Sequence, residues 1–490
     1  MSSPLKKLAG QTAVYGMSSI IGRLLNYLLV PLYTRLFAPE VYGVVTELYA
    51  YVTFLLILLT YGMETGFFRF AQDKNIFDRV YTSILSSLAV TSTAFMVLLL
   101  IFLKPLAGVM EYEAHPEYIL WMGLIVSLDA FISIPFAKLR LQNKAWKFAI
   151  IKLVNIGVNI GLNLYFLILC PRLAINNPDS VLLSIYSPNI GVGYVFIANL
   201  AANLLTFLML LPDILNVRFS FDKKLLKKIL IYSMPLLIAG FAGMINETLD
   251  RVLLKHMVPD AMNPMEQLGI YVANYKLAIL MTLFIQMFRY AAEPFFFSNK
   301  NESNAKELYA KATKYFIICG LMIFLGVMFY IDIVKYFIDV DYHEGLKVVP
   351  ILLLANLFLG IFFNFSIWYK LNDMTKYGAY LAVFGALITI ILNVILIPKY
   401  GYMGSAWATL ICYFAMALLS FYWGQKYYKV PYKLLNAGFY FVLAIILYVS
   451  SIYLRPESQT MVYILNTCLL LVFTIVFVVK ERAWELIRKK

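Results

Sequence analysis

Long apolar runs alternate with short polar and basic connections along the whole chain. A helix needs about 20 mostly apolar residues to cross about 30 Å of hydrocarbon. Fourteen segments meet this requirement and leave almost no room for a soluble domain, so we predict an all-α integral membrane protein. The predicted spans are 12-36, 41-68, 80-103, 117-137, 148-170, 190-211, 229-254, 268-291, 314-332, 348-369, 377-397, 402-424, 434-454 and 459-479.

Composition supports the membrane assignment. Of 490 residues, 62% are hydrophobic and 14% are charged, whereas soluble domains average about 45–50% and 25%. The net charge of +14 would suit a nucleic-acid partner, but the basic residues form short clusters between apolar runs rather than one continuous surface. We therefore expect membrane lipids, and no nucleic acid, as partners.

The basic clusters also predict the orientation. Placing the N-terminus inside puts most lysines and arginines in the inner connections, which is the arrangement that the positive-inside rule describes. Basic residues of the inner side include Lys6, Lys7, Lys223 and Lys224, and also the C-terminal Lys490. We expect a multi-pass protein of the cytoplasmic (inner) membrane with both termini in the cytoplasm.

The two halves of the chain resemble each other. Tyr15-Gly-Met-Ser and Tyr232-Ser-Met-Pro open spans 1 and 7, and Tyr42-Gly43 and Leu268-Gly269 open spans 2 and 8. Six spans separate the repeats, so both halves enter from the same face, as parallel repeats do in many transporters. The expected domains are an N-lobe (1-212, spans 1-6), a basic cytoplasmic interlobe helix (213-228), a C-lobe (229-424, spans 7-12) and a C-terminal part with spans 13-14 and a basic tail (425-490).

Two glycine- and proline-containing segments carry a family resemblance. The run Asn393-Val-Ile-Leu-Ile-Pro398-Lys-Tyr-Gly401-Tyr-Met-Gly404 resembles the span 11 to 12 signature of the polysaccharide-exporting branch of the MOP flippases. The run from Pro31 to Gly43, followed by Gly62-Met-Glu64, is similar to that family's span 1 to 2 signature. The resemblance implies two lobes around a central cavity, and a lipid-linked oligosaccharide or peptidoglycan precursor as cargo.

The same residues have a simple structural interpretation. We expect Pro398 to end span 11, and Gly401 and Gly404 to permit a tight reversal into span 12. The small residues that follow, Ser405, Ala406 and Ala408, would let span 12 approach a neighbouring helix closely. Ordinary helix packing explains these residues, and we assign no binding role to them.

Ionisable side chains inside the predicted spans are the candidate substrate-binding residues. Such a residue costs at least about 2.5–3.5 kcal/mol on insertion scales, so it usually faces a partner or a water-filled cavity. Most of them lie in spans 1, 2, 7 and 8, which by resemblance line the central cavity. The candidates are Arg23, Asn26, Glu47, Glu64, Glu247, Asp250, Arg251 and Lys276.

These candidates suggest binding of an anion. Arg23, Arg251 and Lys276 suit a diphosphate, because guanidinium groups match phosphate oxygens and lysine adds a point charge. The acidic residues would keep the empty cavity near neutrality or bind a coupling Na⁺ or H⁺. Alternatively, Glu247 and Arg251 pair with each other along one helix face. Asp129 in span 4 faces either the cavity or a polar network with residues such as Asn155.

The sequence therefore predicts a transporter rather than an enzyme, with no catalytic residue, metal or cofactor. The expected function is flipping of a polyprenyl-diphosphate-linked oligosaccharide by alternating access, for surface polysaccharide biosynthesis alongside glycan polymerase or ligase machinery. A cation-coupled multidrug exporter of the same superfold is the alternative, although an exporter of cationic drugs favours a predominantly acidic cavity. A membrane glycosyl polymerase or ligase is less well supported, because the outer loops are short.

Overall fold

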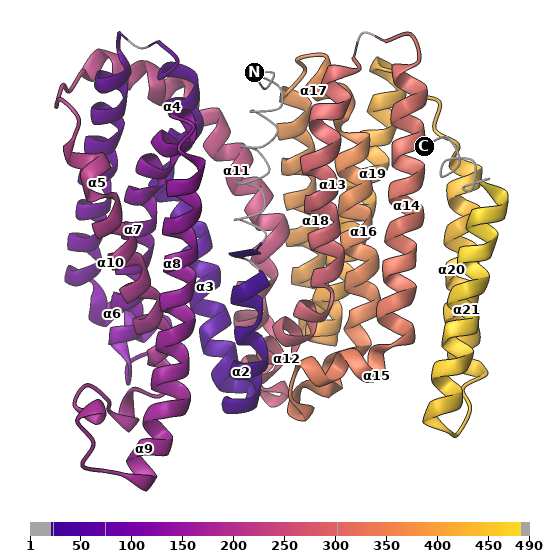
Figure 1. The fold of residues 1–490 in the computed structure, drawn as a ribbon, viewed down its shortest axis with the longest axis horizontal. Coiled ribbons are helices and arrows are strands. Elements are labelled where there is room, and N and C mark those ends of the chain that lie inside the picture. Colours follow the sequence, from indigo (N-terminus) through magenta and orange to yellow (C-terminus); the bar gives the residue numbers. More distant parts are fainter. Residues whose placement is uncertain (1–20, 23, 74, 301, 482–490) are drawn as a thin grey trace. The chain divides into compact units, whose positions relative to one another are not determined.

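The computed structural model describes residues 21–22, 24–73, 75–300 and 302–481, and every regular element in this part of the chain is a helix (Figure 1). The chain forms two compact units, Met1–Val252 and Leu253–Lys490. The division falls inside one helix, α11 (Lys223–Met257). The predicted all-α membrane fold is confirmed.

Unit 1 contains the helices of the first half of the chain and most of α11. Some predicted spans consist of two helical pieces, and a short π-helical turn at Tyr165–Leu169 joins α8 to α9. The helices are α2 (Leu29–Leu36), α3 (Pro39–Thr60), α4 (Met63–Phe70), α5 (Phe77–Ile101), α6 (Leu103–Val109), α7 (Pro116–Leu141), α8 (Ala145–Leu164), α9 (Cys170–Asn176) and α10 (Gly193–Leu215).

Unit 2 begins at the end of α11 and contains the remaining helices. A nine-residue 3-10 segment, Val340–Val348, leads directly into α16. The α-helices are α12 (Pro264–Leu277), α13 (Ile279–Ser298), α14 (Ala305–Phe329), α15 (Ile331–Val334), α16 (Val349–Phe365), α17 (Ile367–Leu371), α18 (Lys376–Tyr400), α19 (Tyr402–Tyr427), α20 (Leu434–Tyr453) and α21 (Gln459–Lys480).

Nearly all of the predicted spans correspond to helices. Within the described residues, twelve helices are long and apolar enough to cross a membrane. The bent pair α12 and α13, which change direction by 50°, makes a thirteenth if the two helices cross as one span. The predicted span 12-36 lies partly outside the described residues, and its last part forms α2. The predicted total of fourteen therefore stays a prediction.

The helices of the two units pack in corresponding pairs. In unit 1, α7 packs on α3, α5 and α10, and α10 also packs on α8. In unit 2, α16 packs on α12, α13, α14 and α19, and α19 also packs on α18. Numbered as predicted spans, the pairs 2–4, 3–4, 4–6 and 5–6 recur as 8–10, 9–10, 10–12 and 11–12. This recurrence supports the six-span repeat that the sequence suggested.

Span 2 is broken where its sequence has a glycine. Tyr61 and Gly62 have positive φ values of 32° and 72°, so α3 ends at Thr60 and α4 begins at Met63. A Cβ atom on Gly62 would lie 3.0 Å from the backbone oxygen of Ser233 in α11. Glycine therefore provides both the left-handed conformation and a close approach between α4 and α11.

The turn between α18 and α19 differs in one detail from the prediction. Pro398 does not end the helix, since α18 continues to Tyr400 and stops at Gly401, which has φ of 54°. At this position the left-handed glycine, rather than the proline, makes the reversal. A Cβ atom on Gly404 would lie 2.5 Å from the Leu396 carbonyl oxygen of α18, so glycine is needed here for the tight reversal that the sequence predicts.

The segment 213-228 is not a separate helix, contrary to the prediction. Helix α10 continues to Leu215, residues 218–222 have no helical structure, and α11 begins at Lys223. Asp222 starts α11, because its carboxylate accepts hydrogen bonds from the backbone N–H groups of Lys224 and Leu225. The Leu225 N–H is the main cause of the lowered pKa of Asp222. The basic residues thus form the first turns of the 35-residue helix α11.

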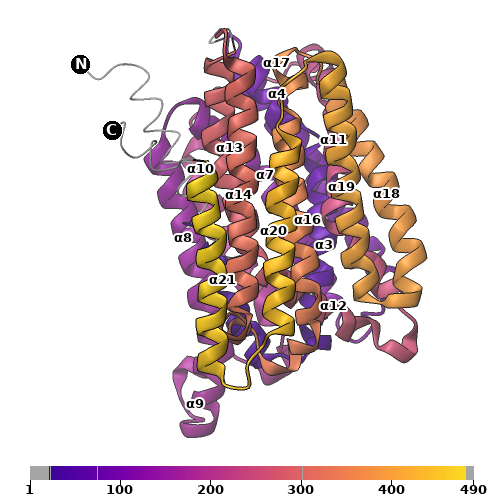
Figure 2. The same ribbon diagram turned by 90° about the vertical axis from the view of Figure 1, so that its right-hand side faces the viewer.

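The last two helices form a hairpin attached to α14. Figure 2 shows α20 and α21 running side by side along α14, and both pack on it. Asn466 of α21 donates a hydrogen bond to the Phe329 carbonyl at 2.6 Å and accepts one from Ser451 of α20. These contacts fit the prediction that spans 13 and 14 are an addition to the second group of six.

Candidate functional site

Two predicted site residues precede α2. Arg23 lies outside the described residues. Asn26, three residues further on, lies in a helical turn and is exposed. In a membrane-spanning helix an exposed amide faces either lipid or a water-filled space, and the second is much less costly.

Helix α11 brings Asp250 and Arg251 together. Arg251 Nη1 donates a hydrogen bond of 2.7 Å to the Glu247 carbonyl oxygen and lies 3.7 Å from Asp250 Oδ1. The Arg251 and Asp250 side chains are only 15% and 6% exposed, whereas Glu247 is exposed. The alternative interpretation, a Glu247–Arg251 side-chain pair, thus needs correction: Arg251 bonds the backbone of Glu247, and the nearby carboxylate is that of Asp250.

Glu47 is fully buried inside unit 1. Tyr112, between α6 and α7, donates a hydrogen bond of 2.5 Å from its hydroxyl to Glu47 Oε2. Burial, followed by the charge of Glu47, raises the pKa of Tyr112, so this tyrosine stays protonated and remains a donor. Tyr51, one helical turn after Glu47, also hydrogen-bonds the carboxylate. Through Oε2, Glu47 thus connects α3 to the loop before α7.

Glu64 lies at the break in span 2, in the first turn of α4. Its carboxylate forms an ion pair with Arg140 near the end of α7. The guanidinium carbon of Arg140 also lies 4.8 Å from the centre of the Phe68 ring. The two charged side chains are 42% and 34% exposed, so this ion pair lies at the surface of unit 1.

Lys276 belongs to unit 2, in the last turn of α12. It is half-buried, and span 8 bends by 50° two residues later. A lysine at the end of a helix is stabilised by the negative end of the helix dipole. Transporters often bind substrate where a spanning helix is interrupted, so the bend gives Lys276 a second feature typical of a substrate site.

A buried polar network in unit 1 includes partners that the sequence analysis did not name. Asn203 of α10 donates to Asp129 Oδ1 at 3.0 Å and accepts from Asn155 at 3.1 Å. Asn155 also donates to Thr206 Oγ1, and Lys152 lies near enough for its charge to act on Asp129. Asp129 therefore belongs to a polar network inside unit 1, one of the two possibilities that its position left open.

Four of the eight predicted site residues fall into two groups. Glu47 and Glu64 have partners within unit 1 that anchor the helices, so they have structural roles that the sequence did not reveal. Arg251 and Lys276 are cations of spanning helices, and such groups can bind an anionic headgroup. Among the described residues, no cluster of three His, Cys, Asp or Glu side chains could hold a metal ion.

Comparison with known proteins places the chain in a family. A model of the family described as "polysaccharide biosynthesis protein" matches residues 8–300, which is more than half of the chain. No curated protein matches the sequence.

Several solved transporter structures share the fold. The lipid II flippase MurJ in an inward closed conformation aligns with a TM-score of 0.70 at 14% identity, covering 95% of this chain and 99% of that chain. An inward-facing multidrug resistance MATE transporter of the MOP superfamily aligns with a TM-score of 0.64 at 16% identity, covering 85% and 94%. A MATE protein in the straight conformation aligns with a TM-score of 0.61 at 16% identity, covering 86% of this chain and 95% of that chain.

These similarities show the fold and not the cargo, because the identities are low. Together with the family match and the apolar helices, they confirm the resemblance that the glycine and proline motifs suggested. The chain belongs to the polysaccharide biosynthesis protein family and is a multi-pass membrane protein with the fold of the MOP-superfamily transporters.

Proposed function

We propose that this transporter moves a polyprenyl-diphosphate-linked oligosaccharide from the inner to the outer leaflet of the cytoplasmic membrane. The family match carries the proposal, because its members are described as polysaccharide biosynthesis proteins and the match, residues 8–300, includes all but the first seven residues of unit 1. The fold likeness to a lipid II flippase adds support, since that protein's named cargo is also a lipid.

The intramembrane cations support an anionic cargo. Arg251 presents a guanidinium group that is fixed by the Glu247 carbonyl and is largely shielded from solvent. In unit 2, Lys276 carries an ammonium group at the bend in span 8. Arginine forms paired hydrogen bonds with phosphate oxygens, and lysine attracts them as a point charge. The arginine–phosphate and lysine–phosphate interactions are both stronger where water is scarce. A diphosphate provides several such oxygens.

Alternating access needs no covalent chemistry. The inward-open state takes up the diphosphate and sugars while the polyprenyl chain stays in lipid, and the outward-open state releases them. With a negative cell interior, exporting two uncompensated negative charges gains about 2 × 2.3 kcal/mol per 100 mV. The membrane potential alone therefore favours export, and coupling to Na⁺ or H⁺ is an additional route.

Both termini would lie in the cytoplasm, with glycan polymerase or ligase machinery acting on the exported product.

A transport assay in liposomes tests the cargo. The purified full chain would be reconstituted with a lipid-linked oligosaccharide, and an impermeant glycosidase would report how much sugar reaches the outer leaflet. We expect faster exposure than in protein-free liposomes, with a further increase when a K⁺ gradient makes the interior negative. No exposure above the protein-free rate, with correctly folded protein, would contradict the proposal.

A cation-coupled multidrug exporter is the second candidate, because several matching structures are MATE transporters. Such an exporter should move an organic cation such as ethidium in the same liposomes when a Na⁺ or H⁺ gradient is imposed. Ethidium transport without oligosaccharide exposure would favour this second candidate. Oligosaccharide exposure without ethidium transport would favour the flippase.

A further inference from the structure

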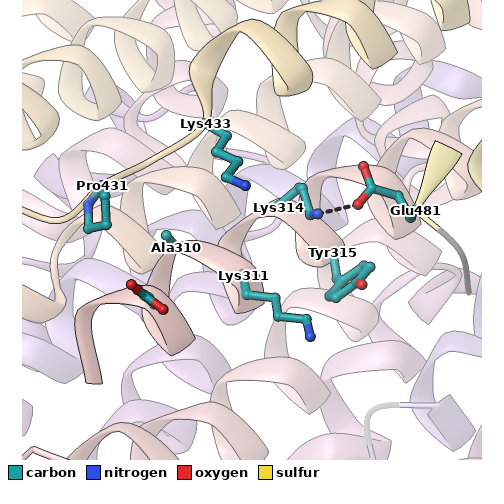
Figure 3. Close-up of a pocket in the computed structure, with 8 residues that line it drawn as sticks. Ala310, Lys311, Lys314, Tyr315, Pro431, Lys433 and Glu481 are labelled. Atoms are coloured by element: carbon teal, nitrogen blue, oxygen red, sulfur yellow. Dashed lines mark hydrogen bonds and ion pairs between the residues drawn. The ribbon is translucent and has the colours of Figure 1, made fainter. Parts of the chain in front are cut away.

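A basic pocket lies in unit 2. It is lined by the first turns of α14, by the loop that precedes α20 and by the C-terminal end of α21. Its volume is about 490 Å³, which falls within the usual range for small-ligand sites. Figure 3 shows Lys311, Lys314 and Tyr315 from α14 on one side, with Lys433 extending towards them from the start of α20. None of these residues belongs to the candidate substrate site.

The pocket has a positive charge that its own residues do not neutralise. Glu481 forms an ion pair with Lys314 and accepts a hydrogen bond of 3.3 Å from the Tyr440 hydroxyl. The other two lysines of the pocket, Lys311 and Lys433, form no ion pair within the described residues. Of the lining residues, Glu307 is then left to balance their two positive charges. Two ammonium groups facing one cavity favour an anion, and three N–H donors on each suit phosphate oxygens.

The surroundings of the pocket indicate that a lipid supplies this phosphate. Leu434 and Leu435, directly after Lys433, are 47% and 92% exposed, and Val479 at the other side is 58% exposed. Exposed apolar residues on membrane-spanning helices face acyl chains. The positive-inside rule places this end of the helices at the cytoplasmic surface, where anionic headgroups attract basic residues. The pocket therefore opens beside the acyl chains.

We propose that this pocket binds the headgroup of an anionic phospholipid, with the phosphate between Lys311 and Lys433 and the acyl chains along α20 and α21. A lipid held there would contact α14 and both helices of the hairpin. It would therefore stabilise the attachment of α20 and α21 to α14, independently of the cargo.

The full chain in detergent would be titrated with phosphatidylglycerol, phosphatidylcholine or inorganic phosphate, with thermal unfolding as the readout. We expect stabilisation by phosphatidylglycerol alone. Near an anionic membrane surface each lysine contributes about fivefold in affinity, so the double variant Lys311→Gln, Lys433→Gln should raise the half-maximal lipid concentration by about 25-fold. The single variant Lys433→Gln changes an exposed residue and should raise the half-maximal lipid concentration about fivefold.

The matched control is the double variant Lys376→Gln, Lys426→Gln. It removes the same charge from exposed lysines at the same end of unit 2, outside the pocket, and should keep the wild-type lipid affinity. Native mass spectrometry of the four proteins would count the retained phosphatidylglycerol molecules. Equal losses in pocket and control variants, no stabilisation by phosphatidylglycerol, or an equal stabilisation by inorganic phosphate would each overturn the proposal.

Discussion

The buried contact between Tyr112 and Glu47 gives a quantitative test of how unit 1 is held together. Tyr112→Phe removes only the hydroxyl that donates to the carboxylate at 2.5 Å. Hydrogen bonds to charged groups contribute about 1.5–3 kcal/mol, and Glu47 is 0% exposed, so water cannot replace the lost donor. We therefore expect Tyr112→Phe to lower the free energy of unfolding by about 2 kcal/mol.

A double-mutant cycle isolates this interaction. Unfolding in mixed detergent would be measured for the wild type, Tyr112→Phe, Glu47→Gln and the double variant. We expect a coupling energy of at least about 1 kcal/mol, because the charged hydrogen bond exists only when both groups are present. A coupling energy near zero would refute the reasoning, since the two substitutions would then act independently. Tyr61→Phe is the matched control, because its hydroxyl bonds Ser87 rather than a carboxylate.

Three further variants test other described contacts. Asn203→Leu should destabilise the protein by about 1–3 kcal/mol in the same unfolding assay, because it leaves Asp129 buried with one donor fewer. Lys314→Met should lower the free energy of unfolding by about 3–5 kcal/mol, because it leaves Glu481 without the lysine of its largely buried ion pair. The double variant Lys314→Met, Glu481→Leu should recover most of this loss, since neither charge of the pair then remains. Burial alone would raise the pKa of Asp332, but hydrogen bonds and charges from Lys335, Gln459 and Arg455 outweigh it and lower this pKa. The ionised Asp332 therefore stabilises the folded protein above the ordinary carboxyl pKa, and this stabilisation is lost as the pH falls through the pKa of Asp332 in the folded state. Asp332→Asn should accordingly be less stable than wild type at pH 7, and the difference should shrink in melts at about pH 3.5.

The spans could be predicted because their cause is local. Each needs a run of apolar residues, and prolines at the first turn of α3, α7 and α12 mark where helices begin. The start of α11 also has a local signal, since Asp222 is a typical N-cap residue, whereas the run of basic residues by itself suggests a separate helix.

The partners of the buried charges could not be predicted in the same way. Tyr112 is 65 residues from Glu47 and Arg140 is 76 residues from Glu64, and nothing in the sequence around either partner indicates the contact. The network of Asp129 did leave a signal, because Asn199, Asn203 and Thr206 follow at helical spacing along one face of α10. Such a polar stripe in an apolar helix indicates a buried network as well as a cavity.

The most direct test of the central claim, that cations within the membrane bind the diphosphate, is the flipping rate of a lipid-linked oligosaccharide in liposomes with wild type, Arg23→Ala and Arg23→Lys. If Arg23 recognises the diphosphate charge, the alanine variant should abolish flipping and the lysine variant should retain part of it, because lysine keeps the charge but loses the paired hydrogen bonds. Full activity of a well-folded Arg23→Ala variant would contradict the account.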